Sequence, residues 1–323
     1  MPLKAHRAMT GDEKGYPATQ PAQIGDNASA ATLCPVIEAI KSDLCDGVRK
    51  DRCADLAFLG NSSSIYRWTP CFMVDLDIFL FADVLDERLG NWLLDCAAWW
   101  RAGLLRQHVD FELRIVEGPY KPAIARLKRP VIVLHLGVFT ERSYLASPPL
   151  KRWGWRKYKC LAEPGRLARL APSRPDLTEL LCGHKGVEYR LNAIASGSVT
   201  MHELVLPSFR EVVFSVSLDH VNFVECCFAY ALSSARNHAR VLGLEEADSF
   251  PNETYFEWYS ENVLNSEALL RLLQIKTRCR NTGFDVDKSL VQTLTVQYLR
   301  SLSETLRTNS ECRTEQTVTP STA

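Results

Sequence analysis

Two aspartates stand two residues apart inside a strongly apolar segment, FMVDLDIFLF, at residues 72–81. The β-branched, aromatic and aliphatic residues of this segment predict a strand, in which Asp75 and Asp77 point to the same face. Two ionised carboxylates side by side repel each other, and burial raises the free-energy cost. A divalent cation between them removes that cost, so we expect Asp75 and Asp77 to bind Mg²⁺ or Mn²⁺. The alternative is a pair at the edge of a sheet that faces water or binds a lysine.

A glycine and a run of small polar residues precede the aspartates. The segment ADLAFLG predicts a short strand over residues 54–60, and NSSS after it predicts a turn or the start of a short helix that stops near residue 70. Glycine permits a sharp turn, and hydroxyl groups together with the peptide N–H groups of a helix N-terminus bind phosphate oxygens. We therefore expect a nucleoside triphosphate to be bound by Gly60, Asn61, Ser62 and Ser63. Taken alone, the segment would be an ordinary N-capping turn.

Together, the two segments resemble the signature of the DNA-polymerase-β-like nucleotidyltransferase superfamily. That signature is an apolar residue, Gly, then Gly or Ser, a spacer, and D-x-D or D-x-E on an apolar strand. In this sequence it reads Leu59-Gly60-Asn61-Ser62-Ser63 and, after a long spacer, Val74-Asp75-Leu76-Asp77-Ile78, with Asn61 in place of the usual Gly or Ser. The resemblance covers roughly residues 35–140. It implies a mixed-sheet palm domain and metal-dependent transfer of a nucleotidyl group from a nucleoside triphosphate to an acceptor.

The superfamily usually carries a third carboxylate on a later strand, and this sequence has a histidine there. The segment RPVIVLHLGVFT at residues 129–140 predicts that strand, with His135 at the matching position. His135 would act as the third ligand or as a general base for the acceptor, or it would be a hydrogen-bonded core histidine. Glu112 or Glu117, on a strand predicted over 110–118, could supply the third acid instead. The histidine in place of the third acid also leaves open that the chain is a catalytically inactive relative with a binding or regulatory role.

A basic segment with interleaved aromatic residues, KRWGWRKYK, occupies residues 151–159. In the nucleotidyltransferase interpretation, this segment closes over the triphosphate, and Lys151 and Arg152 contact its phosphates. As a separate nucleic-acid-binding module, it would stack bases on its aromatic rings and bind phosphates through its cations. A third possibility is a solvated linker whose tryptophans pack at a domain junction.

The elements expected along the chain divide it into two parts. Helical and strand patterns alternate up to residue 140, with helices over 34–49 and 83–108, which argues for an α/β or α+β domain. Long helical patterns follow and predict a helical bundle over 221–243, 266–283 and 285–307. We therefore expect an α+β protein, with a nucleotidyltransferase-like mixed-sheet palm domain followed by a mainly helical domain. The predicted boundaries are a disordered arm at 1–30, the palm-like domain at 31–145, a basic Pro/Gly-rich linker at 146–175, the mainly helical domain at 176–307 and a disordered tail at 308–323.

The composition narrows the class of protein and its partners. Lys plus Arg and Asp plus Glu both number 38 among 323 residues, so the net charge indicates no particular partner. A neutral chain with a separate helical domain favours a small-molecule acceptor, such as an antibiotic or a metabolite, over a long nucleic acid; an RNA, tRNA or protein acceptor stays open. The eleven cysteines include no Cys-x-x-Cys pair, which indicates reduced thiols in a cytoplasmic protein. No apolar run reaches ~20 residues, and the first 30 residues contain no apolar segment, so we expect neither a membrane segment nor a signal peptide.

Overall fold

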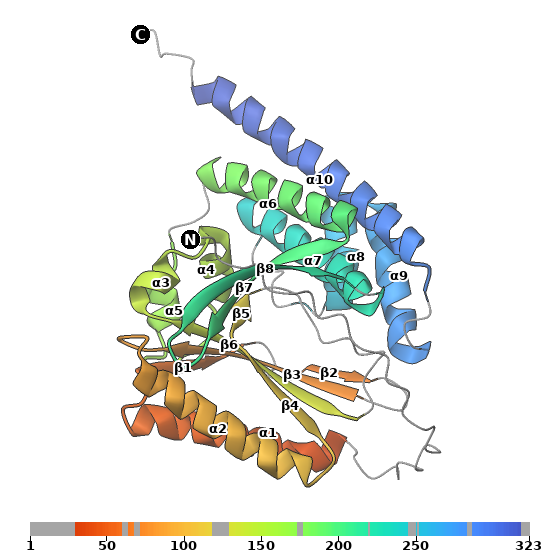
Figure 1. Cartoon of the computed structure of the whole chain (residues 1–323). Coiled ribbons are helices and arrows are strands. Elements are labelled where there is room, and N and C mark those ends of the chain that lie inside the picture. Colours follow the sequence, from red (N-terminus) through yellow and green to blue (C-terminus); the bar gives the residue numbers. More distant parts are fainter. Residues whose placement is uncertain are drawn as a thin grey trace, which may run out of the picture.

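The computed structural model describes residues 30–59, 64–67, 72–117, 129–172, 177–218, 220–244, 250, 252–282 and 286–317. Its architecture is α+β: a mixed sheet with helices forms the N-terminal part, and a mainly helical region follows (Figure 1). The α+β class predicted from the sequence is confirmed at this level.

The strands are, in chain order, β1 (Asp55–Phe58), β2 (Ser64–Arg67), β3 (Phe72–Phe81), β4 (Asp110–Arg114), β5 (Val116–Glu117), β6 (Val131–Phe139), β7 (Ser198–Val205) and β8 (Arg210–Ser217). The helices are α1 (Ala30–Arg49), α2 (Glu87–Leu105), α3 (Glu141–Leu145), α4 (Pro149–Trp155), α5 (Arg166–Arg169), α6 (Leu177–Ser196), α7 (His220–Val241), α8 (Asn252–Asn262), α9 (Glu267–Thr282) and α10 (Lys288–Thr317). The strands predicted around the aspartates and around residue 135 are confirmed as β3 and β6. The long helices predicted in the two halves are confirmed as α1, α2, α7, α9 and α10. The last of these extends into the segment 308–323, for which the sequence predicts disorder.

The main sheet is built around β3. Strands β1 and β2 both pair with β3 in antiparallel fashion along one edge, and β6 pairs with it in parallel along the other. Strand β4 then pairs in parallel with β6, which gives the order β1-β3-β6-β4 with β2 beside β3. Helix α2 connects β3 to β4, so the chain crosses one face of the sheet and leaves the position between these strands for β6.

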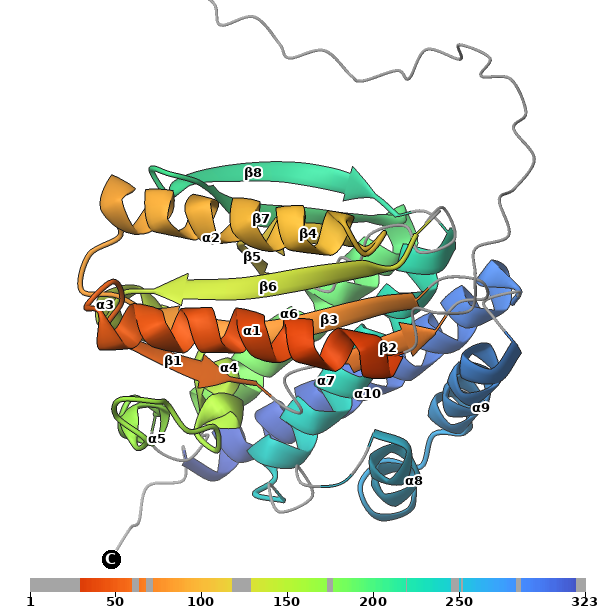
Figure 2. The same ribbon diagram turned by 90° about the horizontal axis from the view of Figure 1, so that it is seen from below.

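One face of this sheet is covered by α1 and α2, which lie side by side across it (Figure 2). Val74, Leu76 and Ile78 of β3 are buried in this layer. Burial of each such side chain stabilises the fold by about 1.5–3 kcal/mol. A hydrogen bond of 2.7 Å from Trp100 Nε1 to Asp43 Oδ2 joins the two helices. Because side chains alternate along a strand, the aspartates between these aliphatic residues point to the opposite face.

The opposite face carries an aromatic cluster at the carboxyl ends of β3 and β6. The ring of Phe79 lies 5.1 Å from that of Phe139 and 4.6 Å from that of Trp155 on α4, measured between centroids. The buried carboxylate of Asp55 on β1 holds α5 against this face. It accepts hydrogen bonds from two peptide N–H groups just before α5 and from Arg166 Nε. The segment predicted as a linker therefore contains two helices, α4 and α5, that pack on the sheet.

Helix α4 also touches the helical region. Gly154 faces the guanidinium group of Arg240 on α7, and a Cβ atom at Gly154 would lie 2.6 Å from it. The lack of a side chain at this position is therefore what allows the arginine to approach the helix backbone. As a result, α4 contacts the sheet through Trp155 and the helical region through Gly154.

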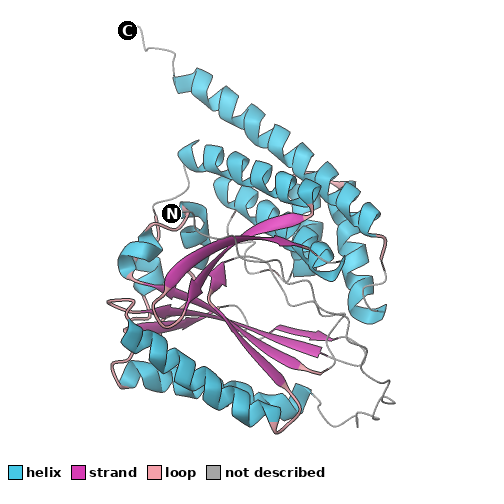
Figure 3. Ribbon diagram, in the orientation of Figure 1, coloured by secondary structure: helices cyan, strands magenta, loops and turns pink. Residues whose placement is uncertain are grey.

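A hairpin of β7 and β8 forms a second sheet with β5 (Figure 3). The patterns considered above predict no element over residues 198–217, although the alternation in VTMHELV is typical of a strand. The turn of the hairpin rests on α2, where a Cβ atom at Gly90 would overlap the carbonyl oxygen of Pro207. The turn of the hairpin thus packs directly against α2.

The helical region has a core of its own, to which α6 to α10 and β7 contribute. Helix α9 begins after Ser266, whose Oγ accepts a hydrogen bond of 3.2 Å from the Leu269 N–H. Helix α7 ends before Gly243, which has a φ of +79° and adopts the left-handed conformation that favours glycine. Both helix ends are as the sequence predicts. None of the helices in the described parts of the chain is long and apolar enough to cross a membrane.

Two glycines of α2 should respond in opposite directions to the same substitution. Gly90→Ala is expected to lower the free energy of unfolding by about 1–3 kcal/mol, because the new methyl group meets the backbone of Pro207. Gly103→Ala is the matched control: its nearest neighbour would be Arg106 at 3.9 Å, so the change should stabilise the helix by up to about 1 kcal/mol. Urea unfolding of both variants measures the difference. Equal effects would contradict the contact between the hairpin and α2.

Stability at acidic pH should depend on His238, which lies buried in the helical core with Nδ1 2.7 Å from the Tyr259 hydroxyl. Burial lowers the pKa of His238 from 6.5 to about 4. Between these values the unfolded chain binds a proton that the folded chain does not, so the free energy of unfolding falls as pH falls, by up to about 1.4 kcal/mol per pH unit. Chemical denaturation at several pH values should show a shallower decline for His238→Gln. An identical decline of the free energy of unfolding in the wild type and in His238→Gln would contradict a lowered pKa of His238.

Candidate metal centre

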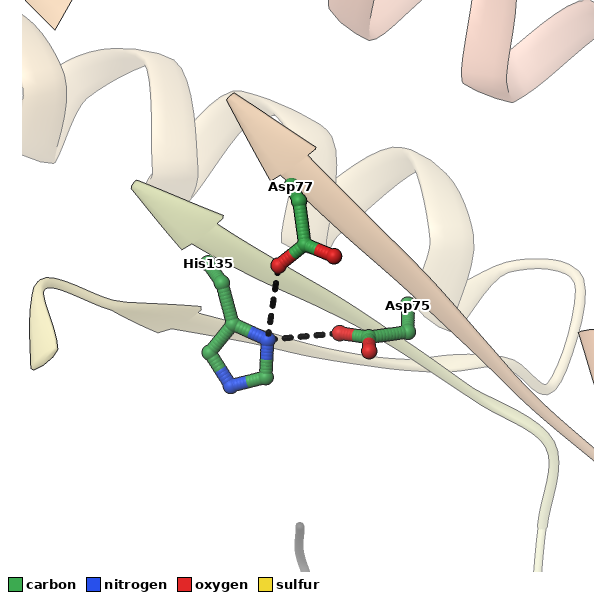
Figure 4. A group of neighbouring side chains, drawn as sticks. All are labelled: Asp75, Asp77 and His135. Atoms are coloured by element: carbon green, nitrogen blue, oxygen red, sulfur yellow. Dashed lines mark hydrogen bonds and ion pairs between the residues drawn. The ribbon is translucent and has the colours of Figure 1, made fainter. Parts of the chain in front are cut away.

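Asp75, Asp77 and His135 come together on the face of the main sheet that α1 and α2 do not cover (Figure 4). The parallel register of β3 and β6 places Asp77 opposite His135. His135 Nδ1 lies 2.5 Å from Asp75 Oδ1 and 3.8 Å from Asp77 Oδ1. One ligand atom from each of the three side chains lies within 4.8 Å of the others. The fold therefore brings together the two aspartates and the histidine that were singled out in the sequence.

The three side chains differ in their access to solvent. Asp75 is 2% exposed and His135 is 8% exposed, whereas the Asp77 side chain is 51% exposed. A buried carboxylate requires a charged or hydrogen-bonding partner, and His135 is such a partner for Asp75. Asp77 therefore marks the open side of the group, from which a ligand can enter.

The imidazole of His135 uses its two nitrogens differently. Nδ1 faces the carboxylates, and its 2.5 Å contact with Asp75 is a short hydrogen bond to a charged acceptor. Nε2 points away from both carboxylates (Figure 4), is buried, and has no hydrogen-bond partner within the described parts of the chain. Because buried polar atoms are seldom left without a partner, Nε2 is a position where a ligand or a water molecule would be stabilised.

The donor set fits one divalent cation. Carboxylate oxygens and imidazole nitrogens are common metal ligands, and the ligands of a six-coordinate ion with bonds near 2.1 Å lie about 3–4 Å apart. The three ligand atoms lie within 4.8 Å of one another, which is close to that range. Small side-chain shifts would therefore allow Asp75, Asp77 and His135 to hold the same ion.

The two glutamates considered as a third acid lie elsewhere. Glu112 is on β4, and β6 separates it from Asp75, a distance of about 10 Å between backbones at roughly 4.8 Å per strand. Its carboxylate binds Arg114 Nη2 at 2.9 Å. Glu117 is on β5 in the second sheet, and its side chain is outside the described residues. Of the three candidates, His135 is the one that the fold brings to the aspartates.

Four predicted triphosphate ligands lie outside the described residues, namely Gly60, Asn61, Ser62 and Ser63. The residues on either side of them are placed. The Leu59 N–H donates to the Asp77 carbonyl oxygen at 3.0 Å, and Ser64 pairs with Asp75 across β2 and β3. Both ends of the predicted phosphate-binding segment therefore meet β3 at the aspartates.

The prediction of a short helix or turn after NSSS is wrong for residues 64–67, which form the strand β2. Strand β1 pairs with only the last four residues of β3, and this leaves an open edge at the start of β3 to which residues 64–67 bind. The sequence SIYR suits this pairing because β-branched and aromatic residues favour strands. The N–H groups of a helix N-terminus at residue 64 are therefore not available for phosphate binding.

Helix α4 uses much of its basic and aromatic surface within the fold. Arg152 donates hydrogen bonds of 3.1 and 2.8 Å to two backbone carbonyl groups, one before α4 and one after α5. The guanidinium carbon of Arg156 lies 4.0 Å from the centre of the Trp153 ring, while Trp155 packs in the aromatic cluster. Lys151 is exposed on the same helix. Arg152 thus links the backbone before α4 to the backbone after α5. The tryptophans offer less ring surface for base stacking than the sequence suggests.

A pocket of about 460 Å³ opens at the carboxyl end of β6, and its lining begins at Leu136, next to His135 in the chain. Its polar side chains are Ser143, Ser147 and the hydrogen-bonded His202 and Glu211, whose Nδ1 and Oε1 atoms lie 2.7 Å apart. Its wall is mainly apolar and includes Leu85, Ile115, Leu136 and Leu204. Sequence reasoning missed His202 and Glu211 because no hairpin was predicted there; the alternating pattern of β7 was the available signal.

Comparisons with protein-family models, with curated proteins and with solved structures give no match for this chain. Its function is therefore inferred from the positions and the chemistry of its own residues.

Removal of Asp75 should destabilise the fold more than removal of Asp77. Asp75→Ala leaves the buried Nδ1 of His135 without this acceptor, and we expect the free energy of unfolding to fall by about 1–3 kcal/mol. Asp77→Ala changes a half-exposed side chain and should stay within about 0.5 kcal/mol. Chemical denaturation in EDTA, which removes any contribution from a bound ion, measures both effects. A larger loss for Asp77→Ala would contradict the burial of the pair.

Proposed function

We propose that the chain is a metal-dependent nucleotidyltransferase, related to the DNA-polymerase-β-like superfamily, that transfers an NMP group from a nucleoside triphosphate to an acceptor. The observation that carries this proposal is the pair of aspartates on one face of β3, with His135 at the opposite position of the neighbouring strand. The segment 60–63 begins and ends beside this pair, which supports the binding of a triphosphate next to it.

Each residue has a separate role in the proposed reaction. Asp75 and Asp77 would hold a divalent ion, Mg²⁺ or Mn²⁺, which neutralises phosphate charge and stabilises the leaving pyrophosphate when bound. The half-exposed Asp77 faces the entering nucleotide, and His135 orients the buried Asp75. The segment 60–63 binds the triphosphate, with Lys151 on α4 as a further phosphate contact.

The transfer exchanges one phosphorus–oxygen bond for another. An oxygen of the acceptor attacks the α-phosphorus, the bond to the oxygen that bridges to the β-phosphorus breaks, and pyrophosphate leaves with that electron pair. The acceptor loses a proton in this step. His135 has two candidate roles that exclude one another: Nε2 accepts the proton while Nδ1 donates to Asp75, or Nδ1 is the third metal ligand and Nε2 carries the ring proton.

The pocket at the carboxyl end of β6 favours a small-molecule acceptor. Its lining begins one residue beyond His135, and its volume of about 460 Å³ suits a compact molecule better than a nucleic-acid helix. A mainly apolar wall with a few polar groups binds an acceptor and fixes its orientation. An RNA or tRNA acceptor is the alternative, and direct tests of both acceptor classes distinguish them.

A catalytically inactive relative with a binding or regulatory role is the second candidate. The contact between Asp75 and His135 favours it, because the imidazole compensates the buried carboxylate without any ion. Such a protein would bind a nucleotide or another ligand without turnover.

Thermal unfolding with nucleotides tests the proposal without knowledge of the acceptor. We expect at least one of ATP, GTP, CTP and UTP, with Mg²⁺ or Mn²⁺, to stabilise the chain by about 2.7 kcal/mol at a concentration 100-fold above its dissociation constant. EDTA or the double substitution Asp75→Asn/Asp77→Asn should remove this effect. Glu112→Gln, on the same face but two strands away, is the matched control and should retain it.

Turnover separates the two candidate functions. Pyrophosphate release in the presence of nucleotide, ion and a small-molecule acceptor is expected of the transferase. Nucleotide stabilisation without pyrophosphate release from any acceptor would favour the inactive relative. Stabilisation that survives the double substitution, or its absence with every nucleotide, would reject a nucleotide site at the aspartates.

A further inference from the structure

We infer that the centre formed by Asp75, Asp77 and His135 binds one first-row transition ion, Mn²⁺ or Co²⁺, in preference to Mg²⁺, with Nδ1 of His135 as the third ligand. This inference rests on the metal centre of the proposed function and assigns the role of its histidine. Two carboxylates alone would suit Mg²⁺. The imidazole at the third position is what changes the preference.

The geometry points to Nδ1 as the ligand atom. Nδ1 lies 2.5 and 3.8 Å from carboxylate oxygens of Asp75 and Asp77, whereas Nε2 points away from both (Figure 4). The strand register fixes this arrangement, because Asp77 and His135 are direct partners on β3 and β6. A neutral imidazole that held the ion through Nδ1 would carry its one proton on Nε2.

An imidazole nitrogen is a poor ligand for Mg²⁺ and a good one for first-row transition ions. Mg²⁺ is small and hard, and it keeps oxygen ligands in octahedral geometry. Affinity for a site of nitrogen and oxygen donors rises along the series from Mn²⁺ through Fe²⁺ to Co²⁺. An imidazole in place of a third carboxylate therefore moves the preference of the centre away from Mg²⁺.

The described acids on the neighbouring strands are paired with Arg114 and add no third carboxylate to the group. Within the described parts of the chain, no further acid joins the group. The next position across the sheet is Arg114, the partner of His135 on β4. Its guanidinium group binds Glu112 at 2.9 Å and lies 3.8 Å from Glu203. Both glutamates are thus paired with this arginine rather than with the centre.

Calorimetric titration of the full chain with MnCl₂, CoCl₂ and MgCl₂, without nucleotide, measures the preference directly. The wild type is expected to bind one Mn²⁺ or Co²⁺ about tenfold or more tightly than Mg²⁺. Pulsed EPR of bound Mn²⁺ should show coupling to a nitrogen nucleus of the imidazole. His135→Asp supplies a third carboxylate, so it should lower the Mn²⁺ to Mg²⁺ affinity ratio by about tenfold and remove the coupling. Glu112→Gln is the matched control and should change neither.

Equal affinity of the wild type for Mg²⁺ and Mn²⁺, or a Mn²⁺ complex without nitrogen coupling, would overturn the inference. The coupling is measured on the wild type, so the test does not depend on the folding of His135→Asp. Failure of the proposed function gives a different result. Selectivity for Mn²⁺ without nucleotide binding would support this inference and reject the transferase, whereas Mg²⁺-dependent nucleotide binding without selectivity would do the reverse.

Discussion

The parallel pairing of β3 with β6 is the constraint on which the remaining structure depends. It places Asp77 opposite His135, pairs Phe81 with Phe139 of the aromatic cluster four residues further along, and turns the aliphatic residues between them toward α1 and α2. A slip of one residue in either strand would move charged groups into the aliphatic layer and aliphatic groups out of it. The burial of many apolar side chains therefore fixes the geometry of three polar ones.

Two buried carboxylates of the sheet have partners of different kinds. Asp55 accepts hydrogen bonds from peptide N–H groups and from Arg166, which cannot release a proton at ordinary pH, so its contacts are permanent. Asp75 instead contacts a single imidazole nitrogen, Nδ1 of His135, at 2.5 Å. The contacts of Asp55 suit a structural role, and the contact of Asp75 with His135 suits a site that exchanges ligands.

Long and regular patterns made β3, β6 and the main helices predictable, and strand alternation alone placed both aspartates on one face. That His135 lies beside Asp77 was expected only from the family resemblance, because the pairing depends on a crossover through α2 that no local pattern encodes. Residues 64–67 follow serines that favour a helix start, but the open edge of β3 offers strand hydrogen bonds instead. In α4, the basic composition of the segment gave no indication that Trp155 packs in the aromatic cluster. The hairpin was missed because His202 and Glu203 interrupt its apolar pattern.

The position of α4 has a consequence for how the chain can be divided. Trp155 packs on Phe79, two residues beyond Asp77, and the adjacent Gly154 receives Arg240 from the helical region. A fragment that ended at residue 145 would lack Trp155 and leave the aromatic rings of β3 and β6 open to water, while an isolated helical region would lose the surface against which Arg240 packs. A gene fusion or recombination event would therefore preserve the packing of the sheet that bears the aspartates only by carrying α4 with it.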